Sequence, residues 1–142
     1  MIRALAPGDV DAVVSVLGLA RLHQGDGVYL VAWEGTEPVG HLHLALTDPP
    51  ELQDVEVREA FRGRGIGTEL IAAAEAECAM RRRRAVQVTV SVDNEGARAL
   101  YERLGYRDSG LAPRRVTGTI EIRSGPIEVD DTLVILEKRL DA

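Results

Sequence analysis

The chain has 142 residues, 45% of them hydrophobic, which is enough for one domain around one core. Its formal net charge of −6 argues against nucleic acid as the main partner. No apolar stretch approaches the roughly 20 residues that span a bilayer, and the N-terminus lacks a signal-peptide pattern. We therefore expect a cytoplasmic protein with no membrane partner. The single cysteine, Cys78, excludes an internal disulfide and a cysteine metal cluster.

The first half of the chain predicts a short strand, a helix and three further strands. Apolar residues recur at helical spacing behind Asp9, a suitable N-cap, so a helix is expected from Asp9 to about Ala20. Residues 21–27 form a polar loop, and a turn at 34–37 joins two strands into a hairpin. The strands are predicted at residues 2–5, 28–33, 38–47 and 51–57.

The second half predicts two helices and several strands. One helix follows the strand 51–57 and ends near the arginines 81–84, and a second runs from 93 to 104 with Gly105 as its C-cap. Strict alternation of valine with polar residues predicts a strand at 86–92. Further strands are predicted at residues 106–111, 119–123 and 131–140, with a loop at 113–118 and a turn at 124–126.

This order of elements predicts the fold class. A strand, a helix and a strand in succession form a right-handed βαβ unit, so the strands 51–57 and 86–92 should be parallel. The order of the remaining elements predicts mostly antiparallel strands. We therefore expect an α/β (α+β) fold with a mixed, mostly antiparallel sheet and helices on both faces. Composition shows no break, so a single domain is expected over residues 1–142.

The stretch 55–70, VEVREAFRGRGIGTEL, places a glycine-rich turn between a strand and a helix. Glycines at 63, 65 and 67 let a ligand approach the backbone, and the first amides of the helix lie at the positive end of its dipole. Such a turn suits an anion, most often a phosphate or pyrophosphate. It is not a P-loop, because Thr68 and Glu69 follow the last glycine, and it lacks the dinucleotide spacing. The other interpretation is a tight turn without a ligand.

Two motifs connect the chain with a known family. The pattern R-x-x-G-x-G at Arg62, Gly65 and Gly67 resembles the acetyl-CoA site of the GCN5-related N-acetyltransferase (GNAT) superfamily. The segment NEGARALYERLGY, with Asn94 and Tyr101 on one helical face, is similar to the second conserved block of that superfamily. The expected order of elements also fits the GNAT fold, so the resemblance covers nearly the whole chain.

One feature departs from the family pattern. Residues 21–27 are too few for the second helix that usually walls the acceptor site in the superfamily. The acceptor side is then either open or completed by another subunit. A homodimer, which is common in the family, is therefore one expected partner.

The resemblance implies an acetyl-CoA-dependent N-acetyltransferase. In this family a primary amine attacks the acetyl thioester directly in a ternary complex. The backbone amides of the glycine turn are expected to bind the pyrophosphate, the strand before it to hold the pantetheine arm, and an asparagine to position the arm or its sulfur. The cofactor-binding residues implied in this way are Val55, Val57, Arg62, Gly63, Arg64, Gly65, Ile66, Gly67 and Asn94.

The resemblance also implies catalytic roles. Tyr101 occupies the family's general-acid position and would protonate the leaving thiolate. The backbone amide of Val57 would stabilise the developing oxyanion. Glu51 lies in the register of the general base of some members, while Asp54 and Glu56 are the other carboxylates that could accept the amine's proton.

Several alternatives remain open from the sequence. The chain could be a non-catalytic acyl-CoA sensor or interaction module of the same fold, or it could use a longer acyl donor. The acceptor could be a small-molecule or peptide amine. His41 and His43 share one strand face, where they could line the acceptor pocket, assist the base or be structural. They are too isolated to indicate a metal, so no metal is expected.

Overall fold

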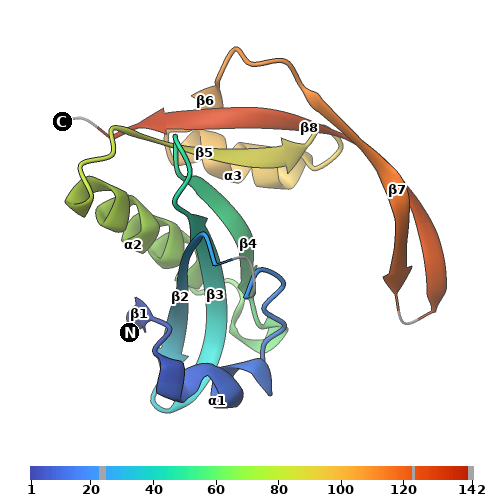
Figure 1. Ribbon diagram of the computed structural model, residues 1–142. Helices are drawn as coiled ribbons and strands as arrows, with labels where there is room; N and C mark the ends of the chain where they lie inside the picture. Colours follow the sequence, from blue (N-terminus) through green and yellow to red (C-terminus); the bar gives the residue numbers. More distant parts are fainter. Residues whose placement is uncertain (23–24, 123, 141–142) are drawn as a thin grey trace. The chain divides into compact units, whose positions relative to one another are not determined.

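The computed structural model describes residues 1–22, 25–122 and 124–140 (Figure 1). They form a mixed α/β fold with a mostly antiparallel sheet and a parallel pair of strands, which confirms the predicted fold class. The chain divides into two compact units, Met1–Val86 with Leu140, and Gln87–Arg139. The expectation of a single domain stays a prediction.

The first unit is built on four strands, each antiparallel to the next in the chain. The pairs Leu30–Leu42 and Leu44–Leu52 lie opposite one another and are buried. The short connections after Glu34 and after Ala45 favour antiparallel neighbours, and the first of them closes the predicted hairpin, whereas α1 (Val10–Val14) lies between the first two strands. The strands are β1 (Ile2–Ala4), β2 (Gly27–Glu34), β3 (Glu37–Ala45) and β4 (Glu51–Val57).

The two faces of this sheet are buried against different elements. On one face, Tyr29, Val31 and Trp33 of β2 pack with Val13, Leu17 and Leu19 in a hydrophobic cluster. On the other, helix α2 (Ile66–Met80) contributes the buried side chains Leu70, Ile71, Ala74 and Cys78. His41 and His43 lie opposite Val31 and Tyr29, so both histidines belong to the first face.

The first helix is shorter than the sequence predicted. A 3-10 turn, η1 (Pro7–Asp9), leads into α1 (Val10–Val14), whereas the helix was expected to continue to about Ala20. The hydroxyl of Ser15 donates to the Ala12 carbonyl at 2.8 Å, a local hydrogen bond that competes with helix continuation. The apolar residues beyond this point reach the core from irregular backbone instead.

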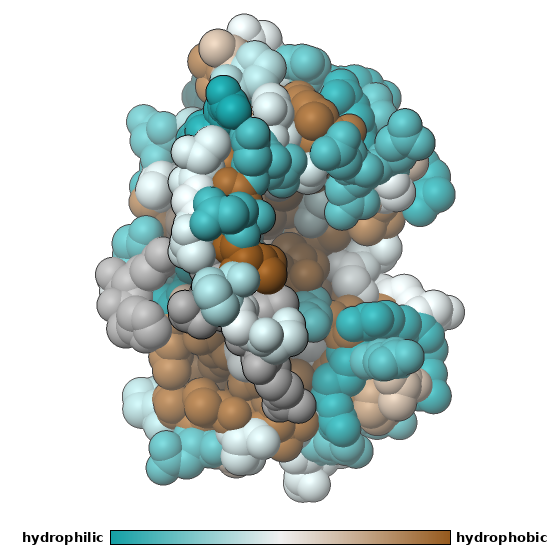
Figure 2. All heavy atoms as spheres, turned by 90° about the vertical axis from the view of Figure 1, so that its right-hand side faces the viewer, coloured by the Kyte–Doolittle hydropathy of each residue, from teal (hydrophilic) through white to brown (hydrophobic). Residues whose placement is uncertain are grey.

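The short helix leaves apolar side chains partly exposed. Val14 and Val16 are each 45% exposed. Figure 2 shows hydrophobic side chains gathered in the lower part of its face, at the height at which Figure 1 draws α1. This end of the first unit is therefore less completely covered than the α2 face, where α2 buries a continuous apolar stripe.

The second unit contains α3 (Glu95–Arg103) and the strands β5 (Ala85–Ser91), β6 (Arg107–Asp108), β7 (Arg114–Ile122) and β8 (Gly125–Arg139). β8 is antiparallel to both β6 and β7. The bounds of α3 and β5 agree with the predicted ranges 93–104 and 86–92 to within one or two residues. The strand expected at 106–111 is confined to the two residues of β6.

The β7–β8 hairpin corrects the prediction of a loop at 113–118 and shortens the predicted turn at 124–126, since residue 124 is in a turn and β8 begins at Gly125. The two strands pair continuously from Arg114 to Ile122, and cross-strand pairs stabilise this exposed ladder. Arg115 forms a two-pronged ion pair with Asp130 at 2.9 Å, and the Thr119 hydroxyl donates to Glu128 at 2.7 Å.

Two expectations about single side chains are confirmed. Cys78 is fully buried on the apolar stripe of α2, and Trp33 is 8% exposed in the core. Within the described residues, no helix has the length and apolar character needed to cross a membrane.

Candidate active site

The glycine turn has the geometry of an anion site. After β4 and the 3-10 turn η2 (Glu59–Phe61), the chain reaches Gly63 at φ +78° and Gly65 at φ +81°. Both are left-handed conformations that glycine adopts without a steric penalty. Gly65 is the N-cap of α2 and provides no side chain to bond the first helical amides. These amides are thus presented at the positive end of a 15-residue helix.

Gly67, the third glycine of the turn, does not have the left-handed backbone of Gly63 and Gly65. A Cβ atom built on Gly67 would lie 3.8 Å from the nearest heavy atom, Cγ2 of Val57, which is ordinary contact. Its backbone does not require glycine for conformational reasons. The absence of a side chain at Gly67 is therefore unexplained by packing and fits the close approach of a ligand to the backbone.

The two arginines of the turn are engaged within the first unit. Arg62 donates through Nε to the Val57 carbonyl at 2.9 Å and lies 3.9 Å from Glu56. Arg64 lies 3.5 Å from Glu34 and over the Phe61 ring. Both side chains remain 57% exposed, so the turn is positively charged at its surface without a dedicated arginine clamp.

Strand β4 contains a bulge that the sequence did not reveal. His41 pairs with Glu56 and His43 pairs with Gln53, so two steps along β3 match three steps along β4. The extra residue falls around Asp54, which has a left-handed backbone at φ 49°. A non-glycine residue with this conformation inside a strand is uncommon, and bulges often redirect a side chain next to a functional site.

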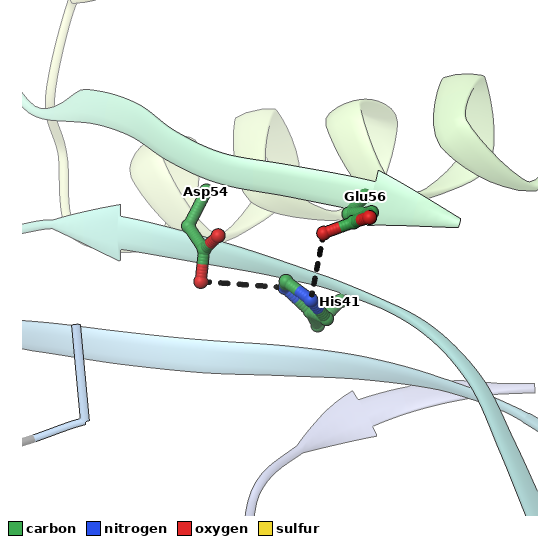
Figure 3. A group of neighbouring side chains, drawn as sticks. All are labelled: His41, Asp54 and Glu56. Atoms are coloured by element: carbon green, nitrogen blue, oxygen red, sulfur yellow. Dashed lines mark ion pairs between the residues drawn. The ribbon is translucent and has the colours of Figure 1, made fainter. Parts of the chain in front are cut away.

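The bulge brings two carboxylates to one histidine (Figure 3). Nδ1 of His41 lies 3.6 Å from Oδ2 of Asp54, and Nε2 lies 3.9 Å from Oε2 of Glu56. Figure 3 shows both acids reaching from β4 toward the imidazole ring, and one oxygen of each lies within 4.8 Å of the other. His41 is 1% exposed, whereas the side chain of Glu56 is 60% exposed. The arrangement therefore connects a buried imidazole with solvent through one carboxylate.

Asp54 is fixed by two hydrogen-bond donors. Its Oδ2 accepts from the Tyr29 hydroxyl at 2.7 Å and from the Ala20 amide at 3.1 Å. Burial and the hydrogen bond to Asp54 raise the pKa of Tyr29 well above its ordinary value, so the phenol remains a donor at neutral pH. The carboxylate is thus positioned on the ring of His41 by groups from β2 and from the segment after α1.

Two cavities lie on the same face of the first unit. One, of about 110 Å³, is lined by His41, Glu56, Arg58 and the backbone segment 16–18. The other, of about 440 Å³, is lined by residues that include Tyr29, His43 and Arg21. Both are compatible with binding of a small polar group beside apolar walls.

The second motif is located on α3 in the second unit. Oδ1 of Asn94 accepts from the Ala97 amide at 3.0 Å, so Asn94 caps the helix. Tyr101, two turns later, is 7% exposed and packs edge-to-face on Tyr106 with ring centroids 5.5 Å apart. Burial raises the pKa of Tyr101 above its ordinary value, so its phenol is neutral at physiological pH. Such a phenol can donate a proton but is a poor base.

Glu51 lies at the opposite end of β4 from the glycine turn. It pairs with Ala45 and is half-buried. Because of the bulge, Glu51 and Glu56 belong to the same face of the sheet as the histidines. Sequence reasoning named His41, Asp54 and Glu56 separately as candidates but did not bring them together as one group. The alternation of the two histidines on one strand was visible, but their partners depend on the register of β4.

The chain belongs to the Acetyltransferase (GNAT) family, since the model of that family matches residues 8–106. This range contains the glycine turn, the His41 group, Asn94 and Tyr101. The resemblance inferred from the two motifs is thereby confirmed.

Curated relatives match only part of the chain. An uncharacterized N-acetyltransferase of Methanocaldococcus jannaschii is 35% identical over 91 residues, which are 58% of this chain and 40% of that protein. A mycothiol acetyltransferase of Corynebacterium glutamicum strain R is 37% identical over 84 residues, which are 57% of this chain and 28% of that protein. The chain thus matches less than half the length of these two relatives.

Solved structures share the fold over the full chain. A GNAT family acetyltransferase from Elizabethkingia anophelis with acetyl-CoA bound has a TM-score of 0.74 at 19% identity, covering 98% of this chain and 97% of its own. The ribosomal-protein-S18-alanine N-acetyltransferase from Escherichia coli has a TM-score of 0.75 at 16% identity, covering 100% and 94%. At these identities the likeness establishes the predicted GNAT fold.

Proposed function

We propose that this chain is an acetyl-CoA-dependent N-acetyltransferase that acetylates a primary amine by direct attack in a ternary complex. The observation that carries the proposal is the glycine turn, where Gly63 and Gly65 are left-handed and the first amides of α2 lack a side-chain cap. Family membership and a neighbour solved with acetyl-CoA bound support acetyl-CoA as the anion.

In this proposal the cofactor is held mainly by backbone. The amides from Arg62 to Gly67 bind the pyrophosphate, and the arginine side chains add positive charge around it. The pantetheine arm pairs with Val55 and Val57 as an additional strand would. Asn94 contacts the arm in addition to capping α3. Only the side-chain contributions are open to test by ordinary substitution, because a backbone amide survives most of them.

The chemistry needs an acid for the leaving thiolate. The amine's lone pair forms the C–N bond while the C–S bond breaks, and the electron pair passes to sulfur. Tyr101 donates its proton to that sulfur, and the amide of Val57 stabilises the oxyanion. The Tyr101 phenol is protonated at neutral pH, with its pKa raised by burial, so its proton is available for the thiolate.

The chemistry also needs a proton acceptor for the amine. An alkylamine has a pKa of about 10.4, so deprotonating it at pH 7 costs about 4–5 kcal/mol. Glu51 is the acceptor that the family register suggests. Asp54 and Glu56 are the other carboxylates on the same strand, and each lies beside His41.

The proposal includes both small-molecule amines and peptide amines as acceptors. Among the relatives and neighbours are a mycothiol acetyltransferase and a ribosomal-protein-S18-alanine N-acetyltransferase. We therefore propose a small-molecule or peptide amine as the acceptor. A cytoplasmic location, a homodimer, and the absence of nucleic-acid and membrane partners stay predictions from the sequence.

Calorimetric titration with acetyl-CoA and with CoA tests the proposal, together with a thiol-release assay over a panel of small and peptide amines. We expect binding of both nucleotides and thiol release with one class of amine. Binding without turnover on any amine would favour the acyl-CoA sensor. Tighter binding of a longer acyl-CoA, with faster turnover, would show that the acyl donor is that longer acyl-CoA and not acetyl-CoA. No binding at all would contradict the proposal at the glycine turn.

A further inference from the structure

The two buried histidines of β3 have different surroundings. His43 is 2% exposed, its Nδ1 is hydrogen-bonded to Oε1 of Gln53 at 2.9 Å, and its Nε2 lies 3.9 Å from Oδ1 of Asp26. His41 is equally buried, but among the described residues its Nδ1 has no hydrogen-bond partner. An unsatisfied buried imidazole costs folding free energy, so its retention between two acids calls for an explanation. A structural role accounts for His43 and leaves His41 unexplained.

The contacts of Asp54 define which nitrogen of His41 is basic. Oδ2 of Asp54 is held by Tyr29 and Ala20 and lies 3.6 Å from Nδ1. A fixed acceptor at this position favours the tautomer with its proton on Nδ1. The lone pair on Nε2 then points toward Glu56, 3.9 Å away. Both separations are slightly longer than hydrogen bonds, as is common for catalytic groups before the substrate is bound.

A cavity gives a substrate access to this pair. His41 and Glu56 line the same cavity of about 110 Å³, whose remaining walls are Arg58 and the segment 16–18. At about 30 Å³ per water, this volume holds a few waters or the terminal aminomethyl group of an acceptor. The exposed carboxylate of Glu56 lies beside the ring that is otherwise out of solvent. A cationic head group entering here meets the Glu56 carboxylate with the imidazole behind it, while the Arg58 guanidinium in the cavity wall is paired with Glu37.

We propose that Glu56 and His41 are the catalytic proton acceptor for the amine substrate, with Asp54 as the positioning residue. This inference rests on the proposed acetyl transfer and assigns the base within the same site. The acceptor is then an alkylammonium whose terminal group is narrow enough to enter the cavity, such as an unbranched primary amine.

The proton balance is complete with groups of this chain. The ammonium R–NH₃⁺ binds the Glu56 carboxylate and passes one proton through it to Nε2 of His41, which becomes an imidazolium between two carboxylates. The neutral amine attacks the thioester carbon. Its second proton replaces the one that Tyr101 gives to sulfur, passing through solvent or bound water. His41 returns its proton to solvent by way of Glu56, so each turnover releases one proton.

Position along β4 favours this pair over Glu51. Glu56 immediately precedes Val57, the residue whose amide is proposed to stabilise the oxyanion. Glu51 is six residues from Val57, or roughly 17 Å at about 3.3 Å per step once the bulge is subtracted. A proton from an amine attacking near Val57 would have to cross that distance through several waters to reach Glu51.

A metal ion explains the cluster less well than a proton relay does. The ligand atoms of His41, Asp54 and Glu56 lie within 4.8 Å of one another, close enough to be considered for an ion. However, an ion would use only one nitrogen of the ring, whereas the closest contacts of Asp54 and Glu56 are with different nitrogens, Nδ1 and Nε2. The order acid–imidazole–acid suits proton transfer.

The test is the pH dependence of thiol release by the full chain with a reactive alkylamine. His41→Asn removes the basic Nε2, and Glu56→Gln removes the exposed carboxylate without disturbing the core. We expect each to lower kcat/KM at pH 7 by tenfold or more, with the deficit shrinking toward pH 10 as solvent deprotonates the amine. The groups that face His41 are Asp54 and Glu56 of β4, Tyr29 of β2, and Arg58, and Arg62 lies 3.9 Å from Glu56; together they shape this profile. The segment 16–18 contributes no titratable side chain.

Chemical rescue separates proton transfer from a structural role. An acceptor amine with a pKa below 7 is already neutral, so both variants should approach the parent's rate with it. His43→Asn is the matched control, since it removes an equally buried imidazole two residues away. That control should keep the pH profile of the parent even if the variant is less stable.

The outcomes distinguish this inference from the function it rests on. Absence of turnover by the parent with every amine overturns the acetyltransferase proposal and, with it, the relay. Turnover by the parent with unaltered profiles for His41→Asn and Glu56→Gln overturns only the relay. If Glu51→Gln alone loses activity near pH 7 and is rescued by the weakly basic amine, Glu51 is the base. Loss of parent activity on chelation, with recovery on adding zinc, would indicate a metal site instead.

Discussion

The hydroxyl of Tyr29 donates to Oδ2 of Asp54 at 2.7 Å and accepts from the Arg21 amide at 2.8 Å. One side chain thereby joins β2, the bulge of β4 and the segment that follows α1. The bond holds a carboxylate whose own backbone is left-handed. If the hydroxyl were removed, the Asp54 carboxylate and the Arg21 amide would each lose a hydrogen-bond partner.

We predict that Tyr29→Phe lowers the free energy of unfolding by about 1–3 kcal/mol, the usual range when a hydrogen bond to a charged group is lost. Urea denaturation at pH 7 measures the change. Thr119→Val is a matched control, because it removes a hydroxyl–carboxylate bond of the same 2.7 Å length on the exposed β7–β8 hairpin. The control should change stability by less than about 0.5 kcal/mol. Equal effects would mean that the Tyr29–Asp54 bond is no more than a surface contact.

The glycine turn permits a separation of folding from ligand binding. Gly67→Ala introduces a Cβ atom at the first turn of α2 without a clash, because its nearest neighbour, Cγ2 of Val57, is 3.8 Å away at ordinary contact distance. We predict unchanged or slightly raised stability, by up to about 1 kcal/mol from helix propensity. We also predict an acetyl-CoA affinity at least tenfold lower, because the methyl group projects toward the backbone site. Calorimetry and thermal denaturation of the same variant test both statements.

Gly65→Ala provides the contrast. At φ +81° an alanine is strained by about 1–2 kcal/mol, so this variant should lose stability as well as affinity. If Gly67→Ala binds acetyl-CoA as the parent does, the missing side chain at Gly67 has no connection with the ligand.

The sequence predicted the glycine turn and the capped helix α3 correctly because each depends on residues close together in the chain. The group around His41 depends instead on the register between two strands. By simple alternation, Glu51 and Glu56 would lie on opposite faces of β4, since they are five positions apart, an odd number. The bulge at Asp54 inserts one residue and places both on the histidine face. A single non-glycine residue with positive φ leaves no local signature, so the site could not be assembled from spacing.

Asn94 has one role that is observed and a second that is proposed. Asn94→Ala should cost about 1 kcal/mol of stability, because the Ala97 amide loses its cap. Asn94→Asp retains a capping oxygen and places a negative charge at a helix N-terminus, so stability should be kept. If Asn94 also contacts the pantetheine arm, the aspartate should lower acetyl-CoA affinity at least fivefold, because it loses the amide donor. An unchanged affinity for the stable aspartate variant would restrict Asn94 to the cap.

Cys78 should make stability fall at alkaline pH. Burial, with the nearby charges of Glu75 and Glu77, raises the pKa of the thiol from 9.0 to about 11. The folded state resists ionisation more than the unfolded state does, so this contribution is full below pH 9 and is lost as pH rises through 11. Between pH 8 and 11 the parent should lose about 2 kcal/mol more than Cys78→Ala, which has no thiol to ionise. Urea denaturation of both proteins at each pH gives the difference, in which other titrations cancel. Parallel pH profiles would show that the thiol ionises equally in both states.

Tyr101 tests the acid half of the mechanism. Tyr101→Phe keeps the ring that packs on Tyr106 at 5.5 Å and removes only the hydroxyl. The thiolate then leaves without its proton donor, so we predict a kcat lower by more than tenfold and an acetyl-CoA affinity within twofold of the parent. Single-turnover thiol release and calorimetry measure the two quantities. Tyr106→Phe removes the hydroxyl of the other ring and should leave kcat within about threefold, even if it reduces stability, because that ring is assigned no part in the reaction. If Tyr101→Phe retains the parent's kcat, the buried phenol is a packing residue, and the thiolate takes its proton from solvent.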